Sequence, residues 1–480
     1  MASLIILGSA YPVFAAPKNV YTDADSGFAV KTANPSIEYA SRHSYGFQEN
    51  DSRTDSFNSV VAIPADVVAK KTGLPFSTKE FQAQLAAEMK KKSAVESEYA
   101  LFRPETYQSA NKKADYETAE DSLFDIFREE DMENGVFSYE TKTVGKRNYY
   151  VISLQSPGAF DKEKDIDRNA SDVKLYLTSE NDILYVAESY CSAETEEAKK
   201  AAAEAGNKDT SLKETYQENG ISMKTADDAM KNPTAVQKAL LPLTEVPLTD
   251  PGFQKSLQKE REGLLKGLSF FKPDKKKAAF EMNDPVLKQK IVLPNDWLYL
   301  RGTPNLKDMD GVKLNIAWAA PHTMLNKFAT VCMNSNVKRD LKPDEIYDLY
   351  DESVFFTSYS YKKGKDKNIS DLIDEIFNIP QADMQKALDE AMPSLLNNEN
   401  LKKYAVLSNT KANILNDGKQ IQFSLASNVK VMDKYDFMTR GVLRGTKDKG
   451  LFSLYVAKGD KAKTEAVLNM ADKVKLLPEK

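Results

Sequence analysis

The pattern of apolar and polar positions runs through one order of elements and then repeats it in the second half of the chain. In the first half, a turn at Gly145-Lys146 precedes the apolar segment YYVISLQ, and VKLYLT and ILYVAES follow. In the second half, Gly418-Lys419 precedes IQFSLAS, and FMTRGVLRGT and LFSLYVAKG follow. Short apolar runs bounded by turn residues predict strands. Strands joined by tight turns are antiparallel, because parallel neighbours need crossovers of about a dozen residues.

The opening of each half shows the same kind of repetition. GFAVKTANPSIEYA is interrupted at Asn34-Pro35, and KIVLPNDWLYL is interrupted at Pro294. Proline has no amide hydrogen to donate to a strand ladder, so in both places it marks the turn between two strands. We therefore predict an α+β fold of two related domains in tandem. Each is an antiparallel sheet packed by helices, in an α/β/α sandwich-like arrangement.

The length of 480 residues supports this division, because a single hydrophobic core stops growing near about 250 to 300 residues. The predicted domains cover residues 19–205 and 278–480. A charged, partly helical linker over 206–277 joins them. Its helix is predicted to be capped by Thr249, with Pro251 in the first turn.

The strongest helix signal in the first half begins at Ser77. Ser77 and Glu80 have the spacing of a capping box, and Phe76 and Phe81 occupy the positions of a hydrophobic staple. Further helices are predicted over 118–130, over 370–377, over 461–476, and from Pro343, where apolar residues at helical spacing run through Ile346, Leu349 and Tyr350 to Val354.

These features resemble PsbP-like domains. The resemblance rests on the closing glycine-lysine turn, strand, hairpin and terminal helix, and on the opening strand, proline turn and aromatic strand of IVLPNDWLYL. It is weaker in the first half, where no tryptophan follows Pro35. The resemblance implies an α/β/α sandwich around an antiparallel sheet, in a family of mostly non-catalytic, exported accessory proteins. It assigns no site residues.

The first residues bear on where the protein is located. Residues 1–15 predict a signal peptide, because Ser3 to Phe14 is apolar and Val13 and Ala15 are small enough for a signal peptidase. The alternative is a short apolar strand. No other run approaches the roughly 18 apolar residues that span a bilayer. We therefore expect an exported, periplasmic or extracellular protein without a transmembrane span.

Charge and cysteine usage exclude some classes of function. The net charge is −5, and acidic and basic residues are interspersed along the chain, which argues against binding of nucleic acid. Cys191 and Cys332 are predicted to be buried thiols, with a cross-domain disulfide as the alternative. The acidic run from Asp161 to Asp167 is predicted to be a solvated hairpin end rather than a calcium site.

Catalytic chemistry has little support in the sequence. His43 and His322 are the only histidines, and each is predicted to be a surface or capping residue. Motifs that build zinc sites, phosphate loops or dinucleotide sites from neighbouring residues do not occur. We therefore predict no catalytic residue, no metal site and no cofactor.

Aromatic residues are the remaining binding candidates. Trp297, Tyr299 and Trp318 gather near the opening strands of the second half, and His322 follows them. Tryptophan and tyrosine often anchor binding sites, although core packing explains them as well.

The leading hypothesis is an exported, soluble, non-catalytic binding or accessory protein of the cell envelope. Its partner is expected to be a protein, an envelope component or a small ligand. The alternative is a hydrolase that uses Asp or Glu carboxylates distant in sequence. The question of catalysis stays open at this level.

Overall fold

The computed structural model describes two compact units, with the main division near residue 276. The predicted signal peptide and Cys332 lie outside the described residues, and so does most of the helix predicted over 461–476. The described residues are 19–32, 35–49, 55–93, 95–108, 118–164, 166–193, 195–206, 248–274, 280–284, 287, 289–302, 312–327, 342–361, 374–397, 402, 405–447, 449–459 and 475–476.

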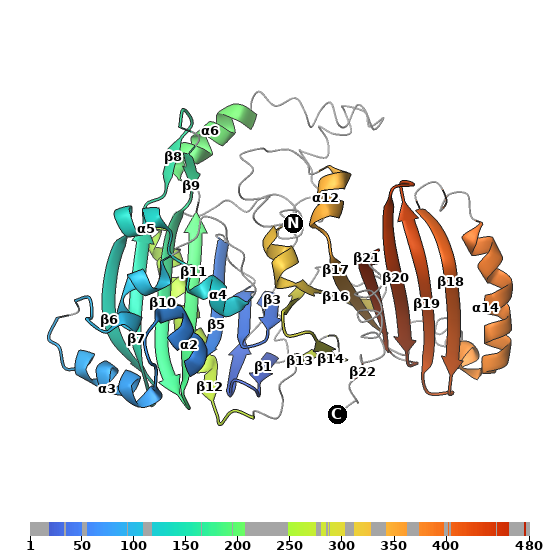
Figure 1. Cartoon of the computed structure of the whole chain (residues 1–480), viewed down its shortest axis with the longest axis horizontal. Helices are drawn as coiled ribbons and strands as arrows, with labels where there is room; N and C mark the ends of the chain where they lie inside the picture. Colours follow the sequence, from blue (N-terminus) through green and yellow to red (C-terminus); the bar gives the residue numbers. More distant parts are fainter. Residues whose placement is uncertain are drawn as a thin grey trace. The chain divides into compact units, whose positions relative to one another are not determined.

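The first unit is built around a large sheet with strand order β3-β4-β5-β11-β10-β7-β6 (Figure 1). In this spatial order, each strand from β4 through β5, β11, β10 and β7 to β6 is antiparallel to its neighbour, as predicted. The strands are β3 (Pro35–Ser41), β4 (Ser44–Glu49), β5 (Asp55–Pro64), β6 (Val136–Val144), β7 (Arg147–Ser156), β10 (Ala170–Glu180) and β11 (Ile183–Ala193).

Helices cover one face of this sheet. Val68, Phe81 and Leu123 from the helices pack against Ile152 and Val186 from the strands in one hydrophobic core. The helices are α2 (Ala65–Thr72), α3 (Thr78–Glu88), α4 (Ala119–Leu123) and α5 (Glu129–Asn134).

The predicted start of α3 is confirmed. The Ser77 hydroxyl accepts a hydrogen bond from the Glu80 amide at 3.3 Å. The rings of Phe76 and Phe81 meet edge to face, with centroids 6.3 Å apart. The single helix predicted over 118–130 is instead divided into α4 and α5.

The opposite face of the sheet carries a small sheet of order β1-β2-β12 and the helix α10 (Pro251–Gly267). Its strands are β1 (Asn19–Asp23), β2 (Phe28–Thr32) and β12 (Leu268–Phe270). Leu257, Arg261 and Leu264 form the buried stripe of α10. This helix was placed in the linker by the sequence, and it packs on the first unit. Its N-cap is Asp250 rather than Thr249, because the Asp250 carboxylate accepts from the Phe253 amide at 2.7 Å.

The second unit has a large sheet of order β15-β16-β17-β21-β20-β19-β18 and a small sheet of order β13-β14-β22. The helices α12 (Pro343–Leu349) and α14 (Gln381–Leu396) belong to this unit, and α14 lies beside β18 (Figure 1). The strands are β13 (Phe280–Asp284), β14 (Gln289–Leu293), β15 (Trp297–Gly302), β16 (Val312–Pro321), β17 (Glu352–Tyr361), β18 (Ala405–Asn416), β19 (Ile421–Val431), β20 (Tyr435–Gly445), β21 (Lys449–Lys458) and β22 (Lys475–Leu476).

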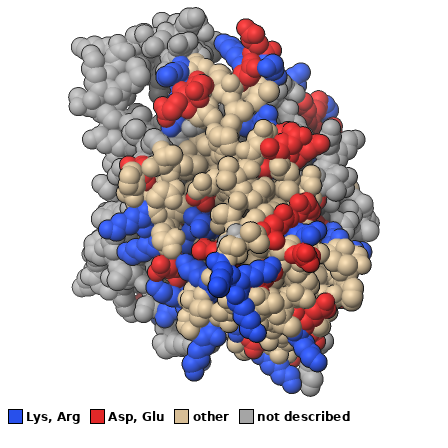
Figure 2. Space-filling model, turned by 90° about the vertical axis from the view of Figure 1, so that its left-hand side faces the viewer, with Lys and Arg blue, Asp and Glu red and all other residues tan. Residues whose placement is uncertain are grey.

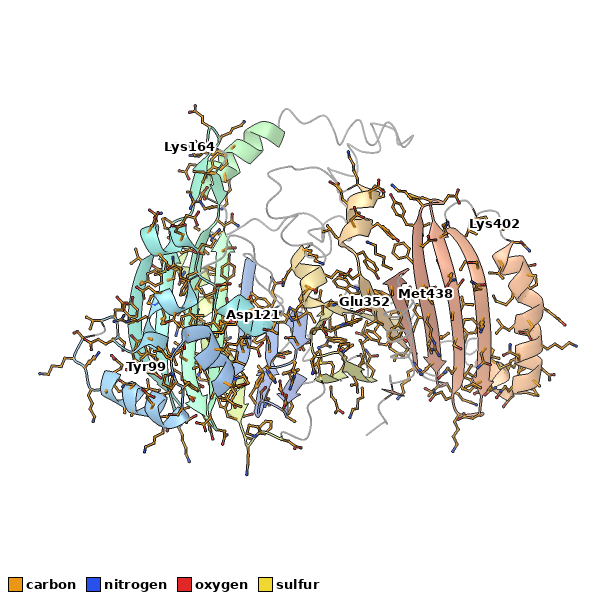
Figure 3. All side chains as sticks on the ribbon, viewed as in Figure 1. Tyr99, Asp121, Lys164, Glu352, Lys402 and Met438 are labelled. Carbon is orange, nitrogen blue, oxygen red and sulfur yellow. The ribbon has the colours of Figure 1, made fainter. Side chains whose placement is uncertain are left out.

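Several elements differ from the sequence prediction. The helix that begins at Pro343 ends at Leu349, and Val354 lies in β17, although its spacing fits a helix. Ile346, which lies within this helix, is 43% exposed. Strands β6 and β18 and helix α14 were not predicted. The acidic run from Asp161 does form a hairpin end, with β8 (Ala159–Asp161) and β9 (Ile166–Arg168), and Lys164 projects from it (Figure 3).

The large sheets of the two units have the same strand topology, because the order β3-β4-β5-β11-β10-β7-β6 corresponds to β15-β16-β17-β21-β20-β19-β18. Each unit also begins with a hairpin whose second strand pairs with a later strand, β12 or β22. The helices are placed differently, since α12 lies between β16 and β17, whereas the described helices of the first unit follow β5. The hairpin turns also agree in detail. Asp23 accepts from the Ser26 amide at 2.9 Å and pairs with Phe28, and Asp284 accepts from the Leu287 amide at 2.8 Å and pairs with Gln289.

Candidate binding site

The aromatic residues singled out in the sequence lie in the second unit and do not share one surface. Trp297 and Tyr299 are each 1% exposed. Trp318 is half-buried and packs near Met324 and Tyr350. Tyr299 pairs with Ala319, so Trp318 projects from the other face of the sheet. Trp297 and Tyr299 are therefore core residues, and their side chains are not available to a partner in this conformation.

His322 is also part of the fold of the second unit. Its amide donates to the Asp296 carbonyl at 2.9 Å, and its side chain is half-buried. This contact joins the start of the helical turn after β16 to the loop before β15. The four predicted residues thus do not come together as a site.

Tyr299 belongs to a buried polar cluster around Asp284, which is fully buried. The Tyr299 hydroxyl donates to Asp284 Oδ2 at 2.6 Å, and Arg301 Nε lies 3.4 Å from the same oxygen. Burial lowers the pKa of Arg301 to about 10, and burial followed by the Asp284 charge raises the pKa of Tyr299 well above its usual value. This cluster fastens the β13–β14 turn to β15.

A second polar cluster lies in the first unit and centres on His43. The ring donates toward Glu120 Oε1 from Nδ1 at 3.0 Å and toward Asp25 Oδ2 from Nε2 at 2.9 Å. The His43 amide donates to Asp23 Oδ2 at 2.9 Å. Burial lowers the pKa of His43, but hydrogen bonds and charge from Glu120 and then Asp25 outweigh it, and the net shift is upward. The sequence suggested a surface or capping histidine, and the structure instead shows a bridge between two carboxylates.

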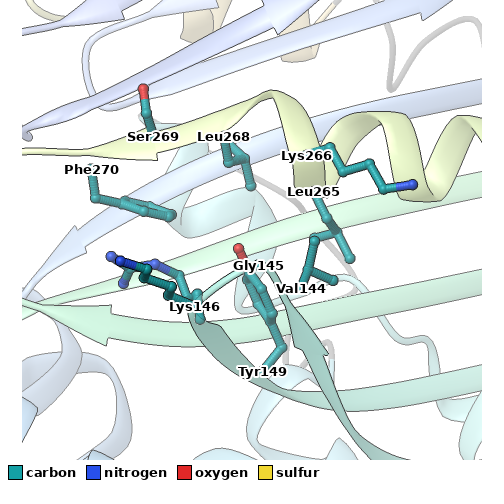
Figure 4. A pocket seen from close by; sticks show the side chains of 10 residues that line it. Val144, Gly145, Lys146, Tyr149, Leu265, Lys266, Leu268, Ser269 and Phe270 are labelled. Atoms are coloured by element: carbon teal, nitrogen blue, oxygen red, sulfur yellow. The ribbon is translucent and has the colours of Figure 1, made fainter.

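The candidate binding site is a groove of about 360 Å3 in the first unit, between the β6–β7 turn and the junction of α10 with β12. Leu265 and Leu268 point toward Val144 and Tyr149, so apolar groups line its middle (Figure 4). Its volume is within the range of ligand pockets. The lining residues are Val144, Gly145, Lys146, Arg147, Tyr149, Leu265, Lys266, Leu268, Ser269 and Phe270.

One wall of the groove is held by contacts between a guanidinium group and aromatic rings. The Arg147 guanidinium carbon lies 4.1 Å from the centroid of the Phe270 ring, and Phe270 lies 4.4 Å from the Tyr185 ring centroid. Arg147 also forms an ion pair with Glu180. A cation over an aromatic ring contributes about 0.5 to 2 kcal/mol. These contacts fix β12 beside β7 before any ligand arrives.

The groove is basic. Lys146 is exposed at the β6–β7 turn, where Gly145 has a φ of 62°. Lys266 is 67% exposed and forms an ion pair with Glu262 at 3.0 Å. None of the described lining residues is acidic. Elsewhere the surface is mixed, since Figure 2 shows Lys and Arg gathered in the lower half of one face with Asp and Glu among them.

The side chains that line the groove are basic, apolar and aromatic, with one serine. The described lining contains no carboxylate, imidazole or thiol. Burial raises the pKa of Tyr149 to about 12, so its phenol stays protonated near neutral pH. The sequence predicted a turn at Gly145-Lys146, but nothing in it indicated that this turn lies beside residues 265–270. The only feature in the sequence that could have pointed to the groove was a basic turn close to an aromatic residue.

No group of three or more His, Cys, Asp or Glu residues suited to a metal ion occurs among the residues that the structure describes. Within the same residues, the helices are too short or too polar to cross a bilayer. Cys191 is a free, fully buried thiol, and burial raises its pKa to about 12.

Comparison with known proteins gives one kind of match. No protein-family model matches the chain, and no curated protein matches it in sequence. The solution structure of cyanobacterial PsbP (CyanoP) from Synechocystis sp. PCC 6803 is 15% identical, over 41% of this chain and 92% of that chain, with a TM-score of 0.22. This chain resembles PsbP. The weak resemblance predicted from the sequence pattern is therefore found among solved structures as well.

Proposed function

We propose that this chain is an exported, non-catalytic binding or accessory protein of the cell envelope that holds an anionic partner in the groove of its first unit. The observation that carries the proposal is the groove itself. It combines an apolar middle, a preformed aromatic wall and basic side chains, and its described lining has no acid or base suited to catalysis near neutral pH. Export is proposed from the signal-peptide pattern of residues 1–15.

We also propose that the two units arose by tandem duplication of one PsbP-like domain. The shared strand order supports this, and so does the equal spacing of the Asp23 and Asp284 turns. In this proposal the units have since diverged, as the different sequences of their corresponding strands indicate. Binding through the groove is assigned to the first unit alone.

The test is capture of partners from the organism's own envelope fraction. The full chain is compared with a Lys146→Glu/Lys266→Glu variant. The control is Lys259→Glu/Lys419→Glu, which makes the same change of charge at exposed positions on α10 and at the glycine-lysine turn of the second unit. We expect the groove variant to lose a partner that the control retains. Equal retention by both variants would refute the groove as the binding site.

One observation supports the alternative function, a hydrolase that depends on carboxylate side chains. Burial raises the pKa of Glu188 to about 7, although the hydrogen bond from the Ser59 hydroxyl at 2.9 Å opposes the shift. A carboxyl group that titrates near neutral pH is suited to general acid or base catalysis. Hydrolysis of chromogenic ester or glycoside substrates by the wild type, abolished in Glu188→Gln, would favour this second candidate over binding alone.

A further inference from the structure

The groove is polar at its two ends and apolar between them. In Figure 4, Lys146 and Phe270 lie on one side and Lys266 lies on the other, with Leu265 and Leu268 between them. A ligand that fills the groove therefore meets a cation, an apolar surface and a second cation in turn.

The two lysines are the cations that a ligand can recruit. Arg147 is already held by Glu180 and by the ring of Phe270. Lys266 pairs with Glu262 across one helical turn at the surface, and solvent screens such a pair strongly. A carboxylate from a ligand can replace Glu262 as a partner of Lys266 at little cost.

The wall that carries Leu268 is a strand edge. β12 lies at the end of the order β1-β2-β12, so among the described strands it pairs on one side only, with β2. An extended peptide adds to such an edge through main-chain hydrogen bonds, and its alternate side chains then enter the neighbouring groove. A lipid headgroup has no comparable use for a strand edge.

We propose that the groove binds an extended acidic peptide of the pattern acid-x-apolar-x-acid, with the apolar side chain packed on the half-buried Val144 and Leu268 and the two carboxylates at Lys146 and Lys266. This inference rests on the proposed function, because it names the chemistry of the partner held in the same groove. In an extended chain the three specified side chains project to one side. Charge complementarity at the two ends fixes the register of the peptide.

The experiment uses the full chain and fluorescein-labelled peptides GEAFAEG and GKAFAKG in a fluorescence anisotropy titration. We expect GEAFAEG to bind the wild type more tightly than GKAFAKG, and the affinity to fall as salt rises. Each of Lys146→Glu and Lys266→Glu should weaken binding of GEAFAEG about threefold to tenfold. The double variant should prefer GKAFAKG, and Lys259→Glu/Lys419→Glu should behave as the wild type. Circular dichroism verifies that each variant is folded.

Other outcomes overturn the inference. The acidic peptide is refuted as the ligand if the two peptides bind with equal affinity. It is also refuted if the two lysine substitutions do not change the affinity for GEAFAEG. Groove-dependent sedimentation with phosphatidylglycerol vesicles, without peptide binding, assigns the groove to anionic lipid instead. If envelope capture depends on the groove but GEAFAEG does not bind, only this inference fails. If capture is independent of the groove, the proposed function fails too.

Discussion

Replacement of His43 by glutamine removes the positive charge that bridges two carboxylates in the first unit. The His43 side chain is 14% exposed, and those of Glu120 and Asp25 are 8% and 17% exposed. Loss of one partner from a fully buried ion pair costs about 3 to 5 kcal/mol. Because this cluster retains some solvent, we expect His43→Gln to lower the free energy of local opening by about 2 to 3 kcal/mol.

The effect depends on pH in a defined direction. The pKa of His43 is raised in the folded state, so the folded chain binds the proton more tightly than the unfolded chain. The stabilisation is complete below the ordinary histidine pKa of 6.5 and is lost as the pH rises through the folded pKa. Burial also raises the pKa of Asp23, against hydrogen bonds from the amides of Ser26 and His43. The raised pKa of Asp23 also makes the folded chain more stable at low pH than at high pH, but over a lower pH range. This contribution is lost as the pH rises through the folded pKa of Asp23.

Hydrogen exchange read by mass spectrometry measures this effect in peptides that span the β3–β4 turn. After correction for intrinsic exchange rates, the wild type should be better protected at about pH 5.5 than at about pH 8.5, and His43→Gln should lose most of that difference. His322→Gln, the same substitution in the second unit, should leave these peptides unchanged. A loss below about 0.5 kcal/mol in His43→Gln, or an unchanged pH dependence, would show that the bridge does not stabilise the turn.

Three further predictions concern the packing of α10 and the buried thiol. Arg261→Met should destabilise the first unit by about 3 to 5 kcal/mol, because it leaves Asp172 buried without its partner at 2.6 Å, and adding Asp172→Leu should restore much of the loss in urea denaturation. Gly267→Ala should cost about 1 to 3 kcal/mol in the same assay, because a Cβ there would lie 2.5 Å from a β2 carbonyl oxygen, whereas Gly263→Ala, with open space around it, should be neutral or stabilising by up to about 1 kcal/mol. In a Cys332→Ser background, which leaves one thiol, Cys191 should react with Ellman's reagent only after denaturation, because its thiol is fully buried and burial raises its pKa to about 12; rapid reaction in the native protein would contradict this burial.

The close approach of α10 to β2 explains why a glycine stands at position 267. Gly263 and Gly267 have the spacing found in closely packed helix pairs. In the structure only Gly267 is needed for a close contact, and that contact is with the backbone of a strand. The glycine therefore permits α10 to end directly above β2 and to continue into β12. The groove exists because of this turn from helix to strand.

Local features of the fold could be predicted from the sequence because they depend on residues close together in the chain. The cap at Ser77 and the turns at Gly145 and Gly418 each involve a few neighbouring residues, and the apolar runs of β10, β11 and β19 to β21 are strands, as predicted. The helical spacing from Ile346 was misleading only at its end, because Val354 lies in β17, whereas Ile346 and Leu349 lie in α12.

The positions of the functional side chains were decided only by the tertiary structure. His43 meets Glu120 across 77 residues, and Arg261 meets Asp172 across 89 residues, with no local pattern to announce either contact. The burial of Trp297 and Tyr299 depends on which face of β15 the small sheet covers. The groove joins residues 144–149 to residues 265–270. Sequence periodicity determines which residues share a face of an element, whereas the pairing of distant elements is set by packing over the whole unit, and this pairing made the candidate site.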